Sequence, residues 1–429
     1  MYRVALSSFL RPFIPSSLLA VFLCGLVGLT PQASGQIQII NGTWDWPDQG
    51  LTLFPEGDID EGAFVNDLLP YGGRLAAAGG FVHAGGLLAP CLAVWDGQVW
   101  SALSSDAPND SVWTLLESGG SLYLGGGFSF IGEIPAKRVA KWDGFSWSGF
   151  GNGLPGTIVS LALWDDGSGV SLYAGGNNIF KWDGLAWSLV GGGIPSGVEA
   201  MTLFNDGSGT ALYICGQGGV AKWNGVGWTS IGGTTGGLPN TLAVFNDGSG
   251  EKLYLGGYFT AVGGVPAVCV ARWDGESWSA VGNPELTPDV AIEQLRVLDD
   301  GSGPALFAVA PGVLQKWDGQ KWTRYVLPWQ AGPATVQVFD GPAGPMLHIA
   351  GSIDLGEYPQ HRYTNIARFT RGFACGDFNR DGVTDQKDLG ILLAVFNCTG
   401  TCSGDADGDG DVDQADLGIL LAHFGQKCG

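Results

Sequence analysis

Basic residues are scarce in this chain of 429 residues. The sequence has 20 Lys and Arg against 41 Asp and Glu, a formal net charge of −21 with a pI near 4.3. A surface with so few cations cannot neutralise many phosphates, so the composition argues against nucleic acid and anionic membranes as partners. Histidine is also rare; the four copies are His83, His348, His361 and His423.

Long hydrophobic runs are missing as well. The apolar run Leu18–Leu29 is too short to span a bilayer comfortably. Arg3 and Arg11 supply positive charge, and the small residues at 33–35 follow the run, which is typical of a secretion signal. We expect residues 1–35 to be removed and the mature chain to be secreted or held at the cell surface, without a membrane segment. A retained N-terminal anchor is the alternative.

Motifs of the common catalytic classes are absent too. The sequence contains no Gly-x-Ser-x-Gly elbow, no His-Glu-x-x-His zinc motif and no phosphate loop. A few acids outside the repeats described below could form a carboxylate pair, although loop carboxylates are usually solvated. They are Asp45, Asp58, Asp60, Glu61 and Glu117. We therefore expect a non-enzymatic protein and name no catalytic residue.

Two acidic loops near the C-terminus carry the strongest pattern in the sequence. In each twelve-residue loop, oxygen-bearing side chains occupy positions 1, 3, 5, 9 and 12, and glycine occupies position 6. Ca²⁺ takes about six to eight oxygen ligands, and the bend at position 6 needs a residue that tolerates positive φ. Position 7 contributes its backbone carbonyl. The expected ligands of two Ca²⁺ ions are Asp377, Asn379, Asp381, Val383, Asp385 and Asp388, and Asp405, Asp407, Asp409, Asp411, Asp413 and Asp416.

A nearly identical apolar segment follows each loop. Leu389, Leu392, Leu393 and Phe396 recur at helical spacing, and Leu417, Leu420, Leu421 and Phe424 repeat them. Each unit is therefore a calcium loop with an exiting helix, and no amphipathic helix precedes the loop.

This duplicated unit, with Asp rather than Glu at position 12, resembles the dockerin domain of secreted polysaccharide-degrading systems over residues 373–429. The resemblance implies a small all-α domain that docks onto a cohesin-like protein in the presence of calcium. Dockerins often have a Ser-Thr pair at loop positions 10 and 11, whereas this chain has 386–387 as Gln-Lys and 414–415 as Gln-Ala. A calcium module that only stabilises the C-terminus is the alternative.

Cysteines concentrate in the same segment, as expected in an oxidising compartment. Among the three pairings of its four cysteines we favour Cys375–Cys428 and Cys398–Cys402. A segment of about 55 residues has little core, so calcium and disulfides would supply stability. The cysteines expected to be buried and free are Cys91, Cys215 and Cys269.

Residues 36–372 form a repeat. The phrase Trp-Asp-Gly or Trp-Asn-Gly recurs at intervals of 40–50 residues, with a second Trp five residues after the first. Periods of this length built from strands and turns indicate propeller blades. The first Trp of each phrase is at 95, 142, 182, 223, 273 or 317.

We predict an all-β, seven-bladed propeller over 36–372. Inner-strand hairpins occur seven times but complete outer hairpins only six times, so the stretch Asn41–Trp46 is expected to complete the last blade and remove its exposed edge. Six or eight blades are the alternatives. The repeated Leu-Tyr-x-Gly-Gly followed by paired Trp, as at Leu122, Leu172 and Leu253, resembles kelch-type, galactose-oxidase-like propellers. WD40 repeats fit less well, because their Gly-His dipeptide is absent.

Two further features have competing interpretations. The phrase Asp/Asn-Asp-Gly-Ser-Gly, beginning at 165, 205, 246 and 299, is expected to be a hairpin turn rather than a metal site. The recurrent Trp residues are expected to pack between blades rather than bind sugar, with the non-repeated Trp113 and Trp329 as better candidates for a binding face.

The expected function is that of a secreted propeller that binds a ligand or partner, a carbohydrate being one candidate, and that carries a calcium-dependent docking module. The alternatives are a carbohydrate-active enzyme, either a glycoside hydrolase or a lyase, and an extracellular scaffold or surface protein.

Overall fold

The structure is a computed structural model that describes residues 38–40, 42–45, 51–52, 63–193, 197–282, 291–300, 303–325, 333–341, 344–354, 363–371, 378, 384–398, 412–422 and 424–425. Most of this part of the chain is β-strand, and strands follow one another as antiparallel hairpins.

Seven sheets of four or five strands account for most of the described residues, and we number them 1 to 7 along the chain. Sheets 1 to 3 are β4 (Phe64–Tyr71), β5 (Arg74–Gly80), β8 (Leu92–Trp95) and β9 (Trp100–Ala102); β10 (Val112–Ser118), β11 (Ser121–Gly126), β14 (Val139–Trp142) and β15 (Trp147–Gly149); and β16 (Ile158–Asp165), β17 (Val170–Gly176), β18 (Ile179–Trp182) and β19 (Trp187–Leu189).

Sheets 4 and 5 continue the same pattern. They are β20 (Val198–Asn205), β21 (Thr210–Gly216), β22 (Gly219–Trp223) and β23 (Trp228–Gly232); and β25 (Pro239–Asn246), β26 (Glu251–Gly257), β29 (Val270–Trp273) and β30 (Trp278–Ala280). A short 3-10 helix, η1 (Val190–Gly192), precedes sheet 4.

Sheets 6 and 7 each include a strand from the N-terminal part of the chain. Sheet 6 is β31 (Gln294–Asp299), β32 (Pro304–Ala310), β33 (Val313–Trp317), β34 (Trp322–Tyr325) and β1 (Gln38–Ile40), and sheet 7 is β35 (Pro333–Gly341), β36 (Gly344–Asp354), β37 (Tyr363–Arg371) and β2 (Gly42–Asp45). β2 pairs antiparallel with β37, at the edge where the sequence places the stretch 41–46. β1 pairs parallel with β34, which the sequence does not predict.

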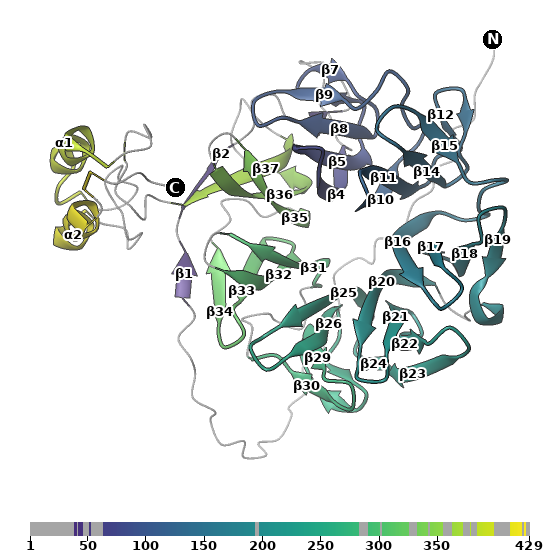
Figure 1. The fold of residues 1–429 in the computed structure, drawn as a ribbon. Coiled ribbons are helices and arrows are strands. Elements are labelled where there is room, and N and C mark those ends of the chain that lie inside the picture. The colour runs from purple at the N-terminus through teal and green to yellow at the C-terminus, as the bar shows by residue number, and fades with distance from the viewer. Residues whose placement is uncertain are drawn as a thin grey trace, which may run out of the picture. The chain divides into compact units, whose positions relative to one another are not determined.

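The first strands of the seven sheets contact one another in a closed order. β4, β10, β16, β20, β25, β31 and β35 each contact the next, and β35 contacts β4 (Figure 1). Side chains reinforce these contacts: Leu115 N–H donates to Asp67, and Leu295 N–H donates to Thr241 Oγ1 at 3.0 Å. Sheets arranged in this way around a common centre form a β-propeller.

The second strands explain why the repeat is rich in apolar residues. A strand lying between two others, in a sheet covered on both faces, is buried on both sides and needs no alternation. In β5, Leu75–Ala78 are all fully buried, and β32 is buried from Ala305 to Ala310. Each group of buried side chains is therefore shared by two neighbouring sheets.

Three small sheets interrupt the repeat. They are β3 (Leu51–Thr52), β6 (His83–Ala84) and β7 (Leu87–Leu88); β12 (Phe130–Ile131) and β13 (Ile134–Pro135); and β24 (Thr234–Thr235), β27 (Ala261–Val262) and β28 (Val265–Pro266). Each extra hairpin connects the second and third strands of sheet 1, 2 or 5. Before the third strand, the chain passes through positive φ at Cys91, Arg138 or Cys269.

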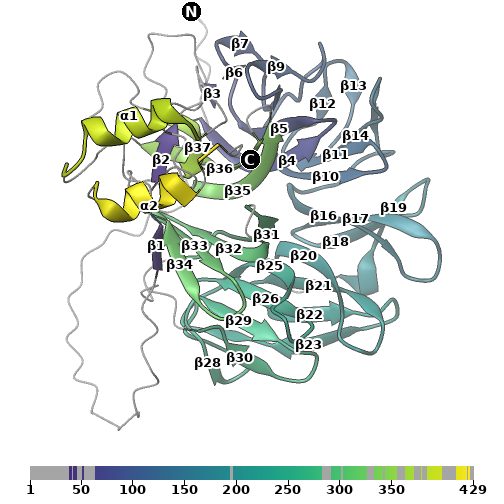
Figure 2. The ribbon, with the colours of Figure 1, turned by 60° about the vertical axis from the view of Figure 1, so that its left-hand side comes forward.

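The two helices of the described chain are α1 (Gln386–Ala394) and α2 (Gln414–Ala422), which lie side by side (Figures 1 and 2). Leu392 and Leu420 are fully buried between them, together with Phe378 and Val412. Three apolar side chains of the helical pattern, those of Leu393, Leu421 and Phe424, are 55%, 56% and 41% exposed.

Candidate functional site

Each C-terminal helix begins at an aspartate of an acidic loop. Asp385 is the N-cap of α1, and its Oδ1 accepts the N–H of Lys387 at 2.7 Å. Asp388 completes a capping box, because its Oδ2 accepts the N–H of Asp385 at 2.8 Å. The second unit repeats this bond, with Asp416 Oδ2 accepting the N–H of Asp413 at 2.7 Å. The loop ends therefore have matching local geometry.

The position-12 aspartates are fully buried. Asp388 and Asp416 are both 0% exposed, although they lie in the first turn of short helices. Burying a carboxylate is costly unless hydrogen bonds and a positive charge compensate for it. A Ca²⁺ ion in the loop would supply that charge, since position 12 is where a calcium loop places an inward carboxylate.

The two units are joined by a pair of related backbone contacts. Thr384 and Val412 occupy position 8 of their loops, and both are fully buried. Asn397 N–H donates to Val412 O at 2.8 Å, and Gly425 N–H donates to Thr384 O at 2.7 Å. Each unit of the duplicated sequence is therefore hydrogen-bonded to the other in the same way.

Four of the twelve expected calcium ligands belong to the described residues: Asp385, Asp388, Asp413 and Asp416. The other eight lie outside them: Asp377, Asn379, Asp381, Val383, Asp405, Asp407, Asp409 and Asp411. Within the described ranges, no three His, Cys, Asp or Glu side chains form a group suited to a metal. The calcium sites therefore stay a prediction.

The cysteines divide into two kinds. Cys91, Cys215 and Cys269 are buried and not disulfide-bonded, which confirms that expectation. Cys398 is disulfide-bonded. The favoured partner Cys402, as well as Cys375 and Cys428, lies outside the described residues, so the pairing stays a prediction.

In the propeller, the Asp/Asn-Asp-Gly-Ser-Gly phrase forms hairpin turns, as expected. The first residue accepts backbone N–H groups: Asp165 Oδ1 binds those of Gly167 and Gly169, each at 2.9 Å. Asn205 and Asn246 do the same in sheets 4 and 5. An amide oxygen accepts these N–H groups as well as a carboxylate oxygen does, which explains why both Asp and Asn occur at this position.

The second residue has a role that the sequence reading missed. Asp166 Oδ2 accepts Lys181 Nζ at 2.5 Å and Tyr173 Oη at 2.8 Å. The same group recurs as Asp206 with Lys222 and Tyr213, Asp247 with Arg272 and Tyr254, and Asp300 with Lys316 and Tyr325. These ion pairs tie the first hairpin of a sheet to its outer strands.

Two sequence signals could have revealed these ion pairs. In sheets 3 to 5, a Tyr stands seven residues after the second Asp, and a Lys or Arg directly precedes the first Trp. Strand register puts them opposite each other, as in Tyr173 with Lys181. In sheet 2 the turn is Gly119-Gly120 and has no acid; there Lys141 Nζ lies 5.5 Å from the Tyr123 ring instead.

The ion pairs determine the protonation of the second acids. Burial raises the pKa of Asp166, but hydrogen bonds from Lys181, Ser168 and Tyr173 outweigh burial and hold the pKa well below its usual range. Asp206 behaves alike. Burial first, and then the neighbouring Asp247, raise the pKa of Tyr254 to about 12.

The glycine of the Trp-Asp-Gly phrase can allow close packing between neighbouring sheets. Gly275 has φ of +108°, and a Cβ there would lie 2.8 Å from the carbonyl oxygen of Asp206 in the preceding sheet. Gly319 approaches Asp247 in the same manner, at 2.7 Å. In sheets 5 and 6 the outer turn therefore packs directly on the inner turn of the preceding sheet.

The paired tryptophans pack between sheets, as predicted. The first and second Trp of a phrase lie with ring centroids 5.1–6.1 Å apart. In every phrase except the first, the second Trp also donates its Nε1–H to the preceding sheet or to the segment that follows it, as Trp278 does to Ile231 O at 2.7 Å and Trp322 to Val281 O at 2.9 Å.

A buried ion pair lies among the first strands. Arg296 on β31 contacts Asp67 on β4 and donates to Leu68 O and Gln337 Oε1, each at 2.6 Å. Asp67 also accepts the N–H of Leu115 at 2.8 Å. Arg296 thereby links sheets 1, 6 and 7, and these contacts have a structural role.

The remaining candidate residues do not form a catalytic group among the described residues. Glu117 is exposed and accepts the N–H of Gly120 at 2.9 Å. Trp113 is half-buried with its ring centroid 6.0 Å from that of Phe64. The candidates that lie outside the described residues, or whose side chains do, are Asp45, Asp58, Asp60, Glu61, Trp329, His361 and His423.

No protein-family model matches the chain, and no curated protein matches it significantly. A search of solved structures does find similar chains. The chain is similar to the extracellular domain of a hybrid two-component system from B. thetaiotaomicron, with 13% identity and a TM-score of 0.48; the match covers 75% of this chain but 39% of that one.

It is also similar to the WD40 β-propeller domain of Doa1, with 12% identity, coverage of 76% and 96% and a TM-score of 0.47. For the WD40 repeats of RRP9 the values are 12%, 75% and 98%, and 0.45. The propeller assignment rests on the sheet order above, since TM-scores this low carry no argument. Among the described helices, none is long and apolar enough to cross a membrane.

Proposed function

We propose that the chain is a secreted binding protein in which a seven-bladed, kelch-like propeller is joined to a calcium-dependent docking module of the dockerin type. The observation that carries the docking part is the pair of fully buried aspartates, Asp388 and Asp416, at the same point of a duplicated loop-helix unit.

Calcium binding would stabilise the folded state of this module. Its described core comprises four buried residues, Phe378, Leu392, Val412 and Leu420, which is small for an independent domain. Two bound Ca²⁺ ions would neutralise the carboxylates of both loops and couple folding to metal binding. Calcium outside cells is typically plentiful enough to fill even weak loops of about 10⁻⁴ M.

The closed propeller is supported by the pairing of β2 with β37. Sheet 7 has three strands from the end of the repeat, and the fourth comes from the N-terminal part of the mature chain. Each of the seven sheets would then be one blade. Closure of this kind is typical of propellers because it leaves no unpaired edge between first and last blade.

Binding to immobilised cohesin domains tests the docking function. The mature chain is passed over a panel of such domains in millimolar Ca²⁺ and again in excess chelator. We expect binding to at least one domain in calcium and none in chelator. A double variant, Asp388→Ala with Asp416→Ala, should not bind, while Glu117→Gln in the propeller should bind as the wild type does. Calcium-independent binding, or no binding to any domain, would contradict the proposal.

A further inference from the structure

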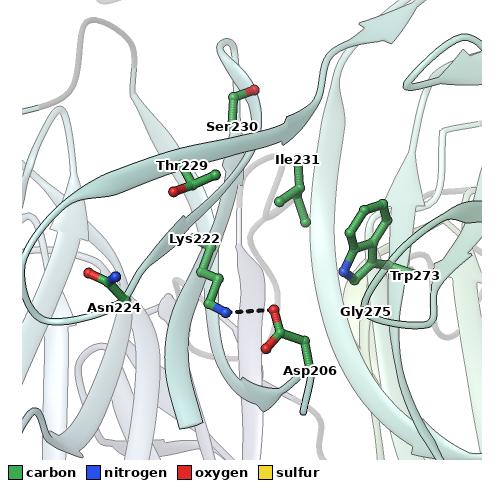
Figure 3. Close-up of a pocket in the computed structure, with 8 residues that line it drawn as sticks. All are labelled: Asp206, Lys222, Asn224, Thr229, Ser230, Ile231, Trp273 and Gly275. Atoms are coloured by element: carbon green, nitrogen blue, oxygen red, sulfur yellow. Dashed lines mark hydrogen bonds and ion pairs between the residues drawn. The ribbon is translucent and has the colours of Figure 1, made fainter. Parts of the chain in front are cut away.

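A cavity of about 440 Å³ lies between sheets 4 and 5 (Figure 3). Its volume is within the range of about 300–1,000 Å³ common for small-molecule sites. β22, β23 and the turns that follow β20 and β22 supply one side, and the end of β29 with the turn after it supplies the other. The lining residues are Asp206, Lys222, Asn224, Thr229, Ser230, Ile231, Trp273 and Gly275.

One wall of this cavity is aromatic. Trp273 is half-buried, and its ring centroid lies 5.4 Å from that of Trp278. The Nε1–H of Trp273 is shielded from solvent and has no hydrogen-bond partner among the described residues. Ile231 extends the apolar surface beside it in Figure 3. A half-buried indole gives a ligand a flat apolar face to stack on.

The opposite side is polar but neutral. Lys222 and Asp206 form an ion pair at 2.5 Å, so their charges cancel. Thr229 and Ser230 are exposed and contribute hydroxyl groups. Asn224 uses its Oδ1 in the turn, where it accepts the N–H groups of residues 226 and 227, which leaves its amide N–H₂ to donate.

The charge balance narrows the class of ligand. An anion would meet the carboxylate of Asp206, and a metal ion would find one carboxylate that already accepts Lys222 and Tyr213. A neutral molecule with several hydroxyl groups meets neither obstacle. One apolar face and a polar periphery are the features of a pyranose ring.

The outer strand of sheet 4 distinguishes this junction from its neighbours. β23 has five residues, whereas β19 and β30 have three. Thr229 lies opposite Lys222, and the pairing of β22 with β23 shifts register between Val220 and Ala221. Of the lining residues, the two additional strand positions supply Ile231.

We infer that this cavity binds one neutral sugar residue, stacked on Trp273 and hydrogen-bonded by Thr229, Ser230 and the amide of Asn224. The inference rests on the binding role proposed for the propeller and gives that role a location and a ligand class.

Calorimetric titration of the mature chain with cellobiose, maltose, lactose, mannobiose and xylobiose tests the inference, with glucuronic acid as the anionic comparison. We expect at least one neutral sugar to bind and glucuronic acid to bind at least tenfold more weakly. Thr229→Trp fills the cavity from an exposed position and should weaken the sugar at least tenfold. Trp273→Phe, which offers a smaller aromatic face for stacking, should weaken it severalfold.

The matched control is Ser188→Trp, because Ser188 lies opposite Lys181 in sheet 3 as Thr229 lies opposite Lys222. It should leave sugar affinity unchanged. Failure of every neutral sugar to bind, or equal affinities of the two Trp variants, would overturn the inference. Thr229→Trp should retain calcium-dependent cohesin binding. A wild-type chain that docks in calcium but binds no neutral sugar would identify a failure of this inference alone.

Discussion

Two adjacent acids in the turn phrase do different work. The first, such as Asp165, accepts backbone N–H groups with one oxygen, and Asn replaces it in sheets 4 and 5. The second, such as Asp166, holds a Lys at 2.5 Å in a partly enclosed site. A residue-by-residue reading of the sequence recognises the turn but not this division, since both acids appear equally exposed in a Gly-rich phrase.

Replacing these acids by amides should separate the two roles. Asp166→Asn leaves Lys181 without its counter-charge and should lower the free energy of unfolding by about 2 kcal/mol. Asp165→Asn keeps the accepting oxygen and should change it by less than about 0.5 kcal/mol. Urea unfolding of the two variants measures the difference. Equal effects would show that the ion pair does not stabilise the sheet.

The same pair predicts a pH dependence. The folded pKa of Asp166 is lower than its ordinary value, so the ionised form favours the folded state. The stabilisation is complete above about pH 5 and is lost progressively as the pH falls below about 4. In urea unfolding from pH 7 to pH 3, wild type and Asp166→Asn should therefore converge. A constant gap over this range would argue against the assignment.

At the scale of elements, the outer turns of sheets 5 and 6 pack on the inner turn of the sheet before them. The Trp-Asp-Gly phrase predicts the turn itself, because the Asp caps it and the Gly takes positive φ. The contact with the preceding sheet could not be predicted, since it depends on how far neighbouring sheets are rotated about the centre. Position 275 therefore requires glycine for two reasons, its positive φ and the nearby carbonyl of the preceding sheet, and the sequence indicates only the first.

Two glycines allow these requirements to be measured separately. Gly144 has φ of +101° and open space around it, whereas a Cβ at Gly275 meets the carbonyl oxygen of Asp206 at 2.8 Å. Gly144→Ala should cost about 1 kcal/mol for its backbone conformation. Gly275→Ala should cost about 2–4 kcal/mol, because overpacking is added. Thermal unfolding provides the comparison, and equal costs would contradict the close approach.

The helices show where periodicity misleads. The spacing of Leu389, Leu392, Leu393 and Phe396 places four apolar side chains on one face of a helix, yet Leu393 is 55% exposed. Asp388 is buried instead, because the loop end turns its carboxylate inward for the cap. A hydrophobicity pattern cannot place an acid on the inner face, although the calcium-loop motif does.

At the scale of the whole molecule, counting incomplete hairpins was enough to predict that 41–46 joins the last sheet. The parallel addition of β1 to sheet 6 was not predictable, because a three-residue parallel edge strand has no signature in the sequence. The extra hairpins of sheets 1, 2 and 5 were missed as well. Their common signal is the Phe that starts each one at 81, 128 and 259 and is almost fully buried.

The joining strand should matter for stability and for solubility. A mature chain without residues 36–46 would expose the edge of β37, so its midpoint of thermal unfolding should fall by several degrees and it should self-associate. A synthetic peptide of residues 36–46 should reverse both effects. Size-exclusion chromatography with thermal unfolding checks this, and an unchanged, monomeric variant would contradict a closed propeller.

Calcium binding by the mature chain is the most direct test of the account. Isothermal titration under oxidising conditions should show two Ca²⁺ ions per chain, with Asp388→Ala and Asp416→Ala each reducing the number to one. Binding should be accompanied by a gain of helical circular dichroism. Absence of binding, or a stoichiometry that neither substitution changes, would contradict both the calcium module and the docking function built on it.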